Sequence, residues 1–503
     1  MRGSRWAIAT GTIAASAALF FVGAPSATAD GDLRKVQHIV IVMQENHSFD
    51  NYFGTLAYAP GSPYHSGPCR DHDHACVDGL TCLRDDAGDL RCFNSNRDDN
   101  SELVVAFHEP NYCVKPDLNH EWLGSHMEAN YADPLNTLRA SLNDGFVRVN
   151  DATEQPDLGG ETPIEDETMG FYTEADLPFY YALAQTFAIS DRYFASLLGP
   201  TFPNRAYALA ATSFGHLNTA EQFPPPGGYK PVNGTILDLL DRHNVFWVNY
   251  VSDVPSTGSF RPFLSEHIRP ITQFFTDAAT GQLPPVAFVD PAFGFGGVQF
   301  DEHPPSNIRA GQFFVSNVVR AVRGGPNWKD SIVFITYDEH GGAYDHVRPP
   351  RARQGHARTP DGVFPGQCAD ATNSVPGSGA NCTLSQLDAL SLCPGFTPFG
   401  PYPDSCPAFD QYGFRVPFIA VSPFSKSHYV SHTVGDHTSL LALLEKRFLS
   451  RDGDDENERP HLTARDLHAN TLEDLFDFEH APSLDAPVVV APPPLPTDPG
   501  CQP

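Results

Sequence analysis

The sequence predicts an α/β fold built on a parallel sheet. Two runs of β-branched and aromatic residues, Val36–Met43 and Ser331–Tyr337, are apolar along almost their whole length. Strands that are buried on both faces of a parallel sheet have this composition. A third run, Pro285–Val289, is followed by a loop and then by a helical pattern over Ile308–Arg323 that leads back to Ser331. This order of strand, loop, helix and strand is typical of a βαβ unit.

The remaining elements are predicted from local patterns. Leu177–Ala188 is helical, and Pro178 suits its first turn, where a backbone N–H is not needed. Leu264–Phe275 is also predicted to be a helix. Before the amphipathic helix Thr438–Phe448, either Thr438 or Asp436 can serve as the cap. The other predicted elements are helices from Trp122, at Ala206–Thr212 and at Thr235–Arg242, and strands at Val245–Val251 and Arg415–Val421.

The N-terminus and the charge predict an exported, acidic protein. Residues 1–29 have the order of a secretory signal, with an early basic residue, an apolar stretch and the small residues Ala27-Thr28-Ala29 before a cleavage point. No later stretch is long and apolar enough to span a membrane. The formal net charge of −29 argues against a nucleic-acid partner and against electrostatic docking on anionic membranes. We expect one catalytic domain over 30–480 and a Pro-rich tail over 481–503.

The ten cysteines predict disulfides in two surface insertions, at about 60–100 and about 355–410. Neither group contains a Cys-x-x-Cys pair, which argues against a zinc site. Connectivity cannot be read from the sequence. Each group holds an odd number of cysteines, so at least one bridge must join the two groups if all ten are paired. The groups are Cys69, Cys76, Cys82, Cys92 and Cys113, then Cys368, Cys382, Cys393, Cys406 and Cys501.

Acidic side chains follow both central strands. Asp338 and Glu339 come directly after one strand, and Glu45 follows the other. Because adjacent carboxylates repel each other, a bound cation is the simplest way to keep them ionised, and oxygen ligands suit hard cations. The alternatives are a solvated acidic turn at Asp338 and a helix-cap role for Glu45. The nearby pair Asp345-His346 favours a site.

A hydroxyl lies in a rigid turn further along the chain. Gly199, Pro200 and Pro203 surround Thr201, and a helical pattern follows. A stiff turn at a helix N-terminus can present a nucleophile, and the first amides of the helix can hold an anion beside it. Asn204 and Arg205 could add donors to phosphate oxygens. The alternative is an ordinary Pro-rich start of a helix.

Two histidines are further candidates. His120 lies before the helix that begins at Trp122, where it is either an active-site imidazole or a residue of the helix N-terminus. His303 belongs to the polar stretch Asp301-Glu302-His303, which is followed by two prolines. The sequence contains neither His-Glu-x-x-His nor Gly-x-Ser-x-Gly, which excludes a metalloprotease helix of that type and disfavours a serine hydrolase.

Three segments together resemble the secreted phosphoesterase family. They are Glu45 to Gly54 (ENHSFDNYFG), Thr201 to Arg205 (TFPNR) and Asp338 to Val347 (DEHGGAYDHV). This family contains bacterial and plant non-specific phospholipases C and a bacterial acid phosphatase, and it is related in fold to alkaline phosphatase. The resemblance covers nearly the whole chain after residue 29. It implies a mostly parallel sheet with helices on both faces and a metal at the C-terminal edge of the strands.

The resemblance also implies roles for individual residues. Glu45, Asp338 and Glu339 are expected to ligate metal, and Asn46 to ligate metal or contact phosphate. Thr201 is expected to be the nucleophile, with its oxygen on the metal. His120 and His303 are expected to contact phosphate or to protonate the leaving oxygen. The remaining expected roles are substrate binding by Asn204, Arg205 and His340, and support of the 338–347 loop by His340, Asp345 and His346.

The expected activity is metal-dependent hydrolysis of phosphate esters through a phosphothreonine intermediate. The cofactor is one or more divalent ions, with Ca²⁺, Zn²⁺, Mg²⁺ and Mn²⁺ all open. Phospholipase C-type cleavage of phospholipids is favoured. Secreted acid phosphatase activity on phosphomonoesters and a non-catalytic binding protein on the same fold are the alternatives. At most a transient contact with a membrane surface is expected, and no nucleic acid. Unlike long bacterial phospholipases of this type, the chain shows no further domain after the catalytic region, and the cysteine-rich insertions depart from the family pattern.

Overall fold

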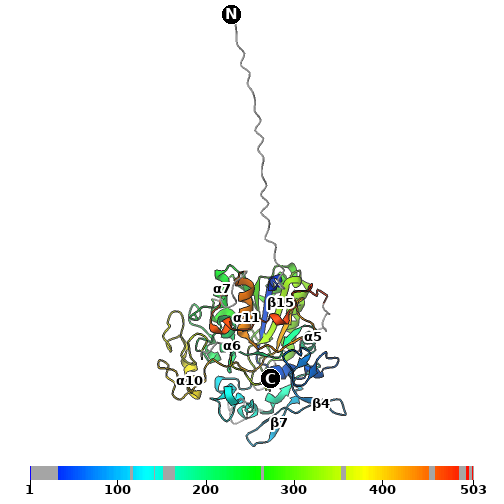
Figure 1. The fold of residues 1–503 in the computed structure, drawn as a ribbon, viewed down its shortest axis with the longest axis vertical. Helices are drawn as coiled ribbons and strands as arrows, with labels where there is room; N and C mark the ends of the chain where they lie inside the picture. The colour runs from blue at the N-terminus through cyan, green and yellow to red at the C-terminus, as the bar shows by residue number, and fades with distance from the viewer. Residues whose placement is uncertain are drawn as a thin grey trace.

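The fold is described from a computed structural model of the chain (Figure 1). The structure describes residues 1, 32–113, 117–140, 142–150, 165–261, 266–352, 358–451, 459–485, 494–497 and 501. The predicted secretory signal, apart from Met1, therefore lies outside the described residues. The predicted division into signal, catalytic domain and tail stays a prediction.

An eight-stranded sheet forms the centre of the molecule, in the order β13-β12-β14-β1-β15-β16-β10-β17. The central strands β1 and β15 run parallel, with Gln44 opposite Tyr337 at their C-terminal ends. β16 runs antiparallel to both of its neighbours. The strands of this sheet are β1 His38–Gln44, β10 Ala188–Ser190, β12 Trp247–Val251, β13 Ile268–Pro270, β14 Val286–Asp290, β15 Ser331–Tyr337, β16 Phe418–Val421 and β17 Val430–Ser431.

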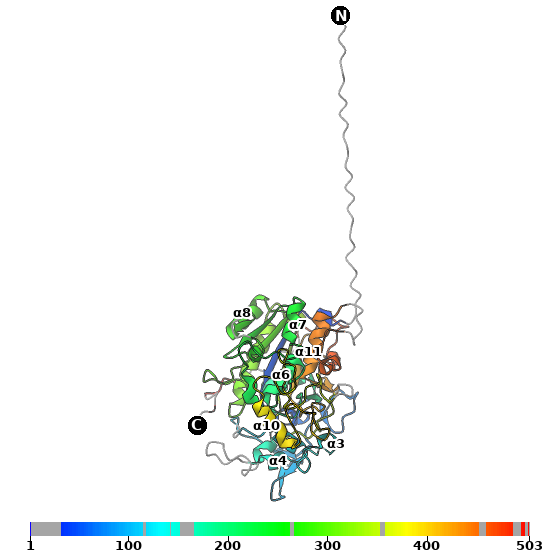
Figure 2. The ribbon, with the colours of Figure 1, turned by 90° about the vertical axis from the view of Figure 1, so that its left-hand side faces the viewer.

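Helices cover both faces of this sheet. On one face α6 packs against α7 and α11, as Figure 2 shows; on the other, α9 packs against α5 and α8. The predicted fold class, an α/β fold with a mostly parallel sheet between two helical layers, is therefore confirmed. The helices are α1 Phe49–Phe53, α2 Trp122–Ala129, α3 Thr137–Ala140, α4 Phe146–Val149, α5 Pro178–Thr186, α6 Thr201–Ala210, α7 Ile236–Arg242, α8 Ile271–Thr280, α9 Ile308–Gly324, α10 Thr383–Leu392, α11 His437–Leu444 and α12 Ala464–Leu467.

Two helices begin five or more residues away from the predicted start. The helix predicted over Leu264–Phe275 begins only at Ile271, because Ile268–Pro270 is extended and pairs with β12 as the edge strand β13. A proline suits an edge strand, since its missing N–H faces no partner. The helix predicted from Ala206 begins earlier, at Thr201, with Pro200 as its N-cap. Of the two candidate caps of α11, Asp436 is the one used.

The structure has five disulfides, and every cysteine is paired. Four bridges close short loops: Cys69–Cys76, Cys82–Cys92, Cys368–Cys382 and Cys393–Cys406. The fifth, Cys113–Cys501, joins the two groups as the odd counts require.

The first insertion, with β4 and β7, and the second, with α10, lie toward the lower end of Figure 1. None of the helices in the described ranges has both the length and the hydropathy needed to cross a bilayer. The short strands outside the central sheet are β2 His65–Ser66, β3 Cys76–Val77, β4 Cys82–Arg84, β5 Leu90–Cys92, β6 Ser95–Arg97, β7 Leu103–Val105, β8 Phe107–His108, β9 Gly170–Phe171, β11 Tyr193–Phe194 and β18 Gly435–Asp436.

Candidate active site

The ends of β1 and β15 bring the predicted acidic residues to one edge of the sheet. Glu45 directly follows β1 and Asp338 directly follows β15, and both side chains are buried. The backbone N–H of Asn46 donates to Asp338 Oδ1 at 3.3 Å, so the two loops are in direct contact. Gly341 makes this contact possible, because a Cβ at that position would lie 2.2 Å from the backbone oxygen of Asn46.

Thr201 lies at the first position of α6 and is buried. The loop before it is held by Asn204, whose side-chain oxygen accepts hydrogen bonds from the backbone N–H groups of Ser196 (2.8 Å) and Leu197 (3.1 Å). The amide of Asn204 donates to the carbonyl of Gly199 at 2.8 Å. Asn204, predicted to contact substrate, thus has its amide engaged inside the loop, where it supports Thr201.

Arg205, one helical turn after Thr201, joins the two strand ends. Its guanidinium lies 3.0 Å from Asp338 Oδ2 and 3.1 Å from Glu45 Oε1. Burial raises the pKa of Glu45 to about 8 and also raises the pKa of Asp338, and Arg205 opposes both shifts. The helix that begins at the predicted nucleophile therefore contacts two of the predicted metal ligands through the side chain of Arg205.

Glu339 faces a second group of charges. Its Oε1 lies 3.8 Å from His120 Nε2, and its Oε2 accepts a hydrogen bond from the N–H of Gly341 at 2.6 Å. Burial alone would lower the pKa of His120, but Glu339 and neighbouring carboxylates outweigh it and raise that pKa to about 10. The buried His340 lies between two carboxylates, with its Nε2 2.7 Å from Glu128 Oε2 and its Nδ1 3.4 Å from Glu339 Oε2. His340 thus lies behind the 338–347 loop, in the supporting position.

A pocket of about 280 Å³ opens beside Thr201. Burial alone would lower the pKa of His303, one of its lining residues, but Asp117, Glu45 and Asp301 outweigh it and raise that pKa to about 9. The polar lining residues include Glu45, Thr201, Arg205, Asp301 and His303, and the aromatic ones are Phe202, Phe260, Phe293 and Phe295. The sequence did not indicate the aromatic wall. The sequence predicts Asp301 only as part of a polar stretch, and the available signal is its place two residues before the predicted site residue His303.

The predicted metal ligands have the chemistry of a hard-cation site. Asn46 Oδ1 and Glu339 Oε1 are buried and accept no hydrogen bond within the part of the chain that the structure describes. Together with Glu45 and Asp338 they offer carboxylate and amide oxygens, the ligands that divalent hard cations take.

Tighter clusters of ligand-type side chains occur elsewhere. Three such groups, with ligand atoms within 4.8 Å of one another, are found among the described residues. Each includes a cysteine that is bound in a disulfide: Cys76, Cys69 or Cys368. A disulfide sulfur is not a thiolate ligand, so these groups are poorer candidates than the oxygen set.

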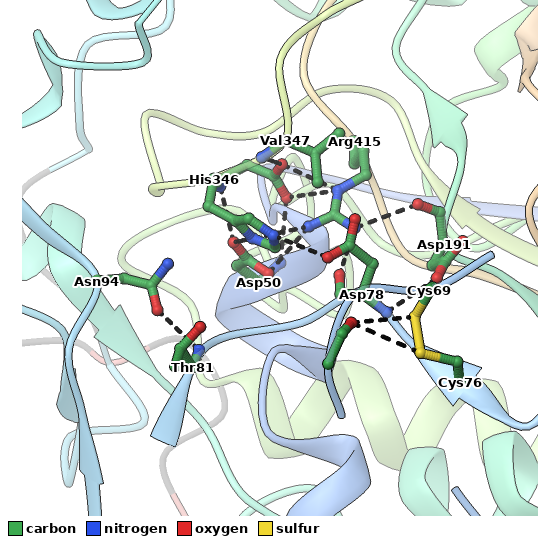
Figure 3. A network of polar contacts seen from close by, with 12 residues as sticks. Asp50, Cys69, Cys76, Asp78, Thr81, Asn94, Asp191, His346, Val347 and Arg415 are labelled. Carbon is green, nitrogen blue, oxygen red and sulfur yellow. Dashed lines mark hydrogen bonds and ion pairs between the residues drawn. A yellow bond between two sulfur atoms is a disulfide. The ribbon is translucent and has the colours of Figure 1, made fainter. Parts of the chain in front are cut away.

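Arg415 anchors the far end of the 338–347 loop (Figure 3). It is fully buried, and its Nε donates to Asp345 at 2.9 Å while its Nη2 donates to Asp50 at 2.9 Å. His346 bridges Asp50 (2.6 Å) and Asp78 (3.1 Å), and Asp78 belongs to the first disulfide-rich insertion. This insertion is thereby tied to the loop that carries Asp338 and Glu339, which places Asp345 and His346 in the predicted supporting position.

The network predicts a pH-dependent contribution of His346 to stability. Burial alone would lower its pKa, but Asp50 and Asp78 outweigh it and raise the pKa from 6.5 to about 10. Because the folded pKa is the higher one, the contribution is complete below pH 6.5 and is lost as the pH rises through about 10. We expect His346→Gln to lower the free energy of unfolding by about 2 kcal/mol at pH 6, and by less at pH 10.

Urea denaturation at the two pH values measures this difference. His65→Gln is the matched control, because His65 forms a solvent-exposed pair with Asp73 in the same insertion. It should change the free energy of unfolding by less than about 0.5 kcal/mol at either pH. Equal destabilisation by His346→Gln at both pH values would contradict a raised pKa of His346 in the folded protein.

Comparison with known proteins supports a phosphoesterase. The chain matches the phosphoesterase family over residues 36–449. It is 30% identical to phospholipase C B of Mycobacterium tuberculosis, over 93% of this chain and 83% of that protein. It is 29% identical to non-specific phospholipase C6 of Arabidopsis thaliana, over 90% of this chain and 75% of that protein. Among solved structures, a 2-O GAG sulfatase overlaps 57% of this chain and 68% of its own, with 13% identity and a TM-score of 0.28, a likeness too low to add to the assignment.

Proposed function

This chain belongs to the phosphoesterase family and is a hydrolase of phosphate esters; on that premise we propose that it cleaves phospholipids as a phospholipase C, through a phosphothreonine intermediate at Thr201. The observation that carries the proposal is the shared pocket. Thr201 lines it at a helix N-terminus, next to Glu45, Arg205 and His303. A hydroxyl, acids and protonated donors at one opening are the groups that phosphoryl transfer needs.

In the proposed first step, Thr201 Oγ1 loses its proton to water and bonds to phosphorus, and the bond from phosphorus to the alcohol oxygen breaks. Arg205 and the first amides of α6 bind the phosphoryl oxygens. His303, whose raised pKa keeps it protonated at neutral pH, donates a proton to the departing oxygen. In the second step, water displaces Thr201 from phosphorus, neutral His303 takes the proton that the attacking water loses, and Thr201 Oγ1 takes up a proton from the solvent. His120 is a second candidate donor on the Glu339 side of the site.

A divalent ion fits this account. Glu45, Asn46, Asp338 and Glu339 would hold it. When bound, it would lower the pKa of the Thr201 hydroxyl and neutralise charge on the phosphoryl oxygens. Arg205 and the ion would contact the same two carboxylates, those of Glu45 and Asp338. The position of Arg205 therefore depends on these two carboxylates.

Assays on two substrates test the proposal. Purified protein is incubated with phosphatidylcholine or with p-nitrophenyl phosphate, each with and without a chelator. We expect release of phosphocholine from the lipid. Release of inorganic phosphate from the small ester alone would favour an acid phosphatase. Turnover of neither ester by metal-replete protein would contradict catalysis and favour a binding protein.

The mouth of the pocket predicts a difference between lipid and soluble substrates. Phe295 lines the pocket, is 63% exposed, and lies in a glycine-rich loop with the exposed Val298. Placing a phenylalanine side chain in lipid is worth about 2 kcal/mol. We expect Phe295→Ala to lower activity on phosphatidylcholine vesicles about tenfold and to leave activity on soluble p-nitrophenylphosphorylcholine within about twofold.

Phe399→Ala is the matched control, because Phe399 is 72% exposed but lies in the second insertion and does not line the pocket. It should change neither activity. Equal losses on the vesicle and the soluble substrate in Phe295→Ala would show that Phe295 contributes inside the pocket and not at a lipid surface.

We also infer that the protein is exported. The five disulfides fit an oxidising compartment, and residues 1–29 have the order of a secretory signal. Sequencing the N-terminus of the protein recovered from the medium or periplasm should give Asp30 as the first residue. A first residue at Met1 would contradict cleavage.

A further inference from the structure

Glu302 is a fully buried carboxylate that receives four hydrogen bonds. Its Oε1 accepts from the hydroxyl of Tyr180 at 2.5 Å and from the amide of Gln44 at 3.1 Å. Its Oε2 accepts from the hydroxyls of Tyr52 at 2.5 Å and Tyr337 at 2.7 Å. The donors come from α5, β1, α1 and β15, four elements in three distant parts of the sequence.

Two of these donors are the last residues of the two central strands. Gln44 ends β1 and is followed by Glu45; Tyr337 ends β15 and is followed by Asp338. Successive side chains of a strand point to opposite faces. Gln44 and Tyr337 therefore reach Glu302 on the α5 and α9 side, while Glu45 and Asp338 turn to Arg205 on the α6 side.

The chain around Glu302 belongs to the same site. The carbonyl of Asp301 accepts a hydrogen bond from the N–H of Glu45 at 2.8 Å, and His303 lines the pocket. Glu302 itself has a φ of 73°, and its carbonyl lies 3.1 Å from His47 Nε2. On the other side Gly311 of α9 packs so closely that a Cβ there would lie 2.1 Å from Glu302 Cγ.

A buried carboxylate adds little net stability, because its desolvation offsets its hydrogen bonds. What four convergent bonds supply is a defined position for the groups that donate them. We propose that Glu302 is a positioning residue that sets the ends of β1 and β15 and the 301–303 loop, so that Glu45 and His303 line the pocket and Asp338 lies against Arg205. The inference rests on the proposed function only in that it takes these three residues as parts of the site.

Two tyrosines make a matched test. Tyr337→Phe and Tyr180→Phe each remove one hydroxyl from Glu302, but only Tyr337 is followed by a site residue. We expect similar losses of thermal stability in both variants. In Tyr337→Phe, kcat on the phosphate ester should fall about tenfold with KM within about twofold, since small misplacement of reacting groups has large effects on rate. In Tyr180→Phe, kcat should stay within about twofold of the wild type. Glu302→Gln should show at least the kcat loss of Tyr337→Phe.

Amide hydrogen exchange gives a readout that does not need activity. Exchange over residues 44–46 and 338–340 should become faster in Tyr337→Phe and stay unchanged in Tyr180→Phe. Equal changes in the two variants, or a kcat of Tyr337→Phe within twofold of the wild type, would overturn the proposal. If the wild-type protein turns over no phosphate ester, the proposed function fails, and the exchange difference alone decides whether Glu302 positions these segments.

Discussion

Thr201→Ala is expected to lower kcat on any phosphate ester that the protein hydrolyses by about 10⁴-fold, because it removes the proposed nucleophile. The substitution replaces the hydroxyl and the methyl group of Thr201 with hydrogen atoms. Because this change is small and lies at the first position of α6, the fold should remain. Steady-state kinetics on phosphatidylcholine, with circular dichroism to check the fold, measure the effect. Binding of substrate should weaken much less than turnover.

The control is another threonine of the same pocket. Thr219 also lines it, and its hydroxyl accepts a hydrogen bond from the N–H of Phe202 at 3.2 Å. Thr219→Ala should lose less than about tenfold in kcat, since it removes one hydrogen bond to the loop. Thr201→Ser should keep measurable activity, because it retains a hydroxyl. Thr201→Ala with more than a tenth of wild-type kcat would exclude Thr201 as the nucleophile.

The second large effect concerns the proposed metal ion. Treatment with a chelator is expected to lower turnover by about 10³-fold or more, and adding back a divalent ion should restore it. The fold should survive the treatment, because Arg205 already lies against Glu45 and Asp338 and partly neutralises them without an ion. Near-ultraviolet circular dichroism should therefore be unchanged while activity is lost.

Asp338→Asn gives the corresponding variant. It removes one charge from the predicted ligand set while keeping the shape of the side chain. We expect activity to fall about 10²-fold or more and the ion needed for half-maximal activity to rise at least tenfold. Full activity after exhaustive chelation would contradict metal dependence, and unfolding after chelation would show that the ion has a structural role.

The central sheet could be predicted because the composition of each strand is visible in its local sequence. β15 begins and ends at the residues predicted, Ser331 and Tyr337, since every side chain of this run is buried and apolar or small. The predicted start of the helix at Leu264 was wrong for the opposite reason. Ile271–Thr280 is a regular helix, but the three residues before it are extended by pairing with β12, and that partner is not visible in local sequence.

The site could be predicted in part. The acids after β1 and β15 meet because parallel strands end at one edge of a sheet, and this follows from the fold class alone. The bonds that Arg205 forms with Glu45 and Asp338, and the internal bonds of Asn204, depend on the packing angle of α6 against the sheet. The three hydroxyls and one amide that surround Glu302 come from four separate elements. Contacts between residues that are distant in the sequence leave no periodic pattern in it. The sequence therefore showed these residues without showing what they contact.

The most direct test of the account is to trap the covalent intermediate. The protein is mixed with an excess of a phosphate ester and quenched in acid within the first turnovers, and its peptides are analysed by mass spectrometry. The account predicts a phosphoryl group, with the headgroup attached if the ester is a phosphodiester, on Thr201 in wild-type protein and not in Thr201→Ala. A modification on another residue, or rapid turnover with inversion at phosphorus and no modified Thr201, would contradict it.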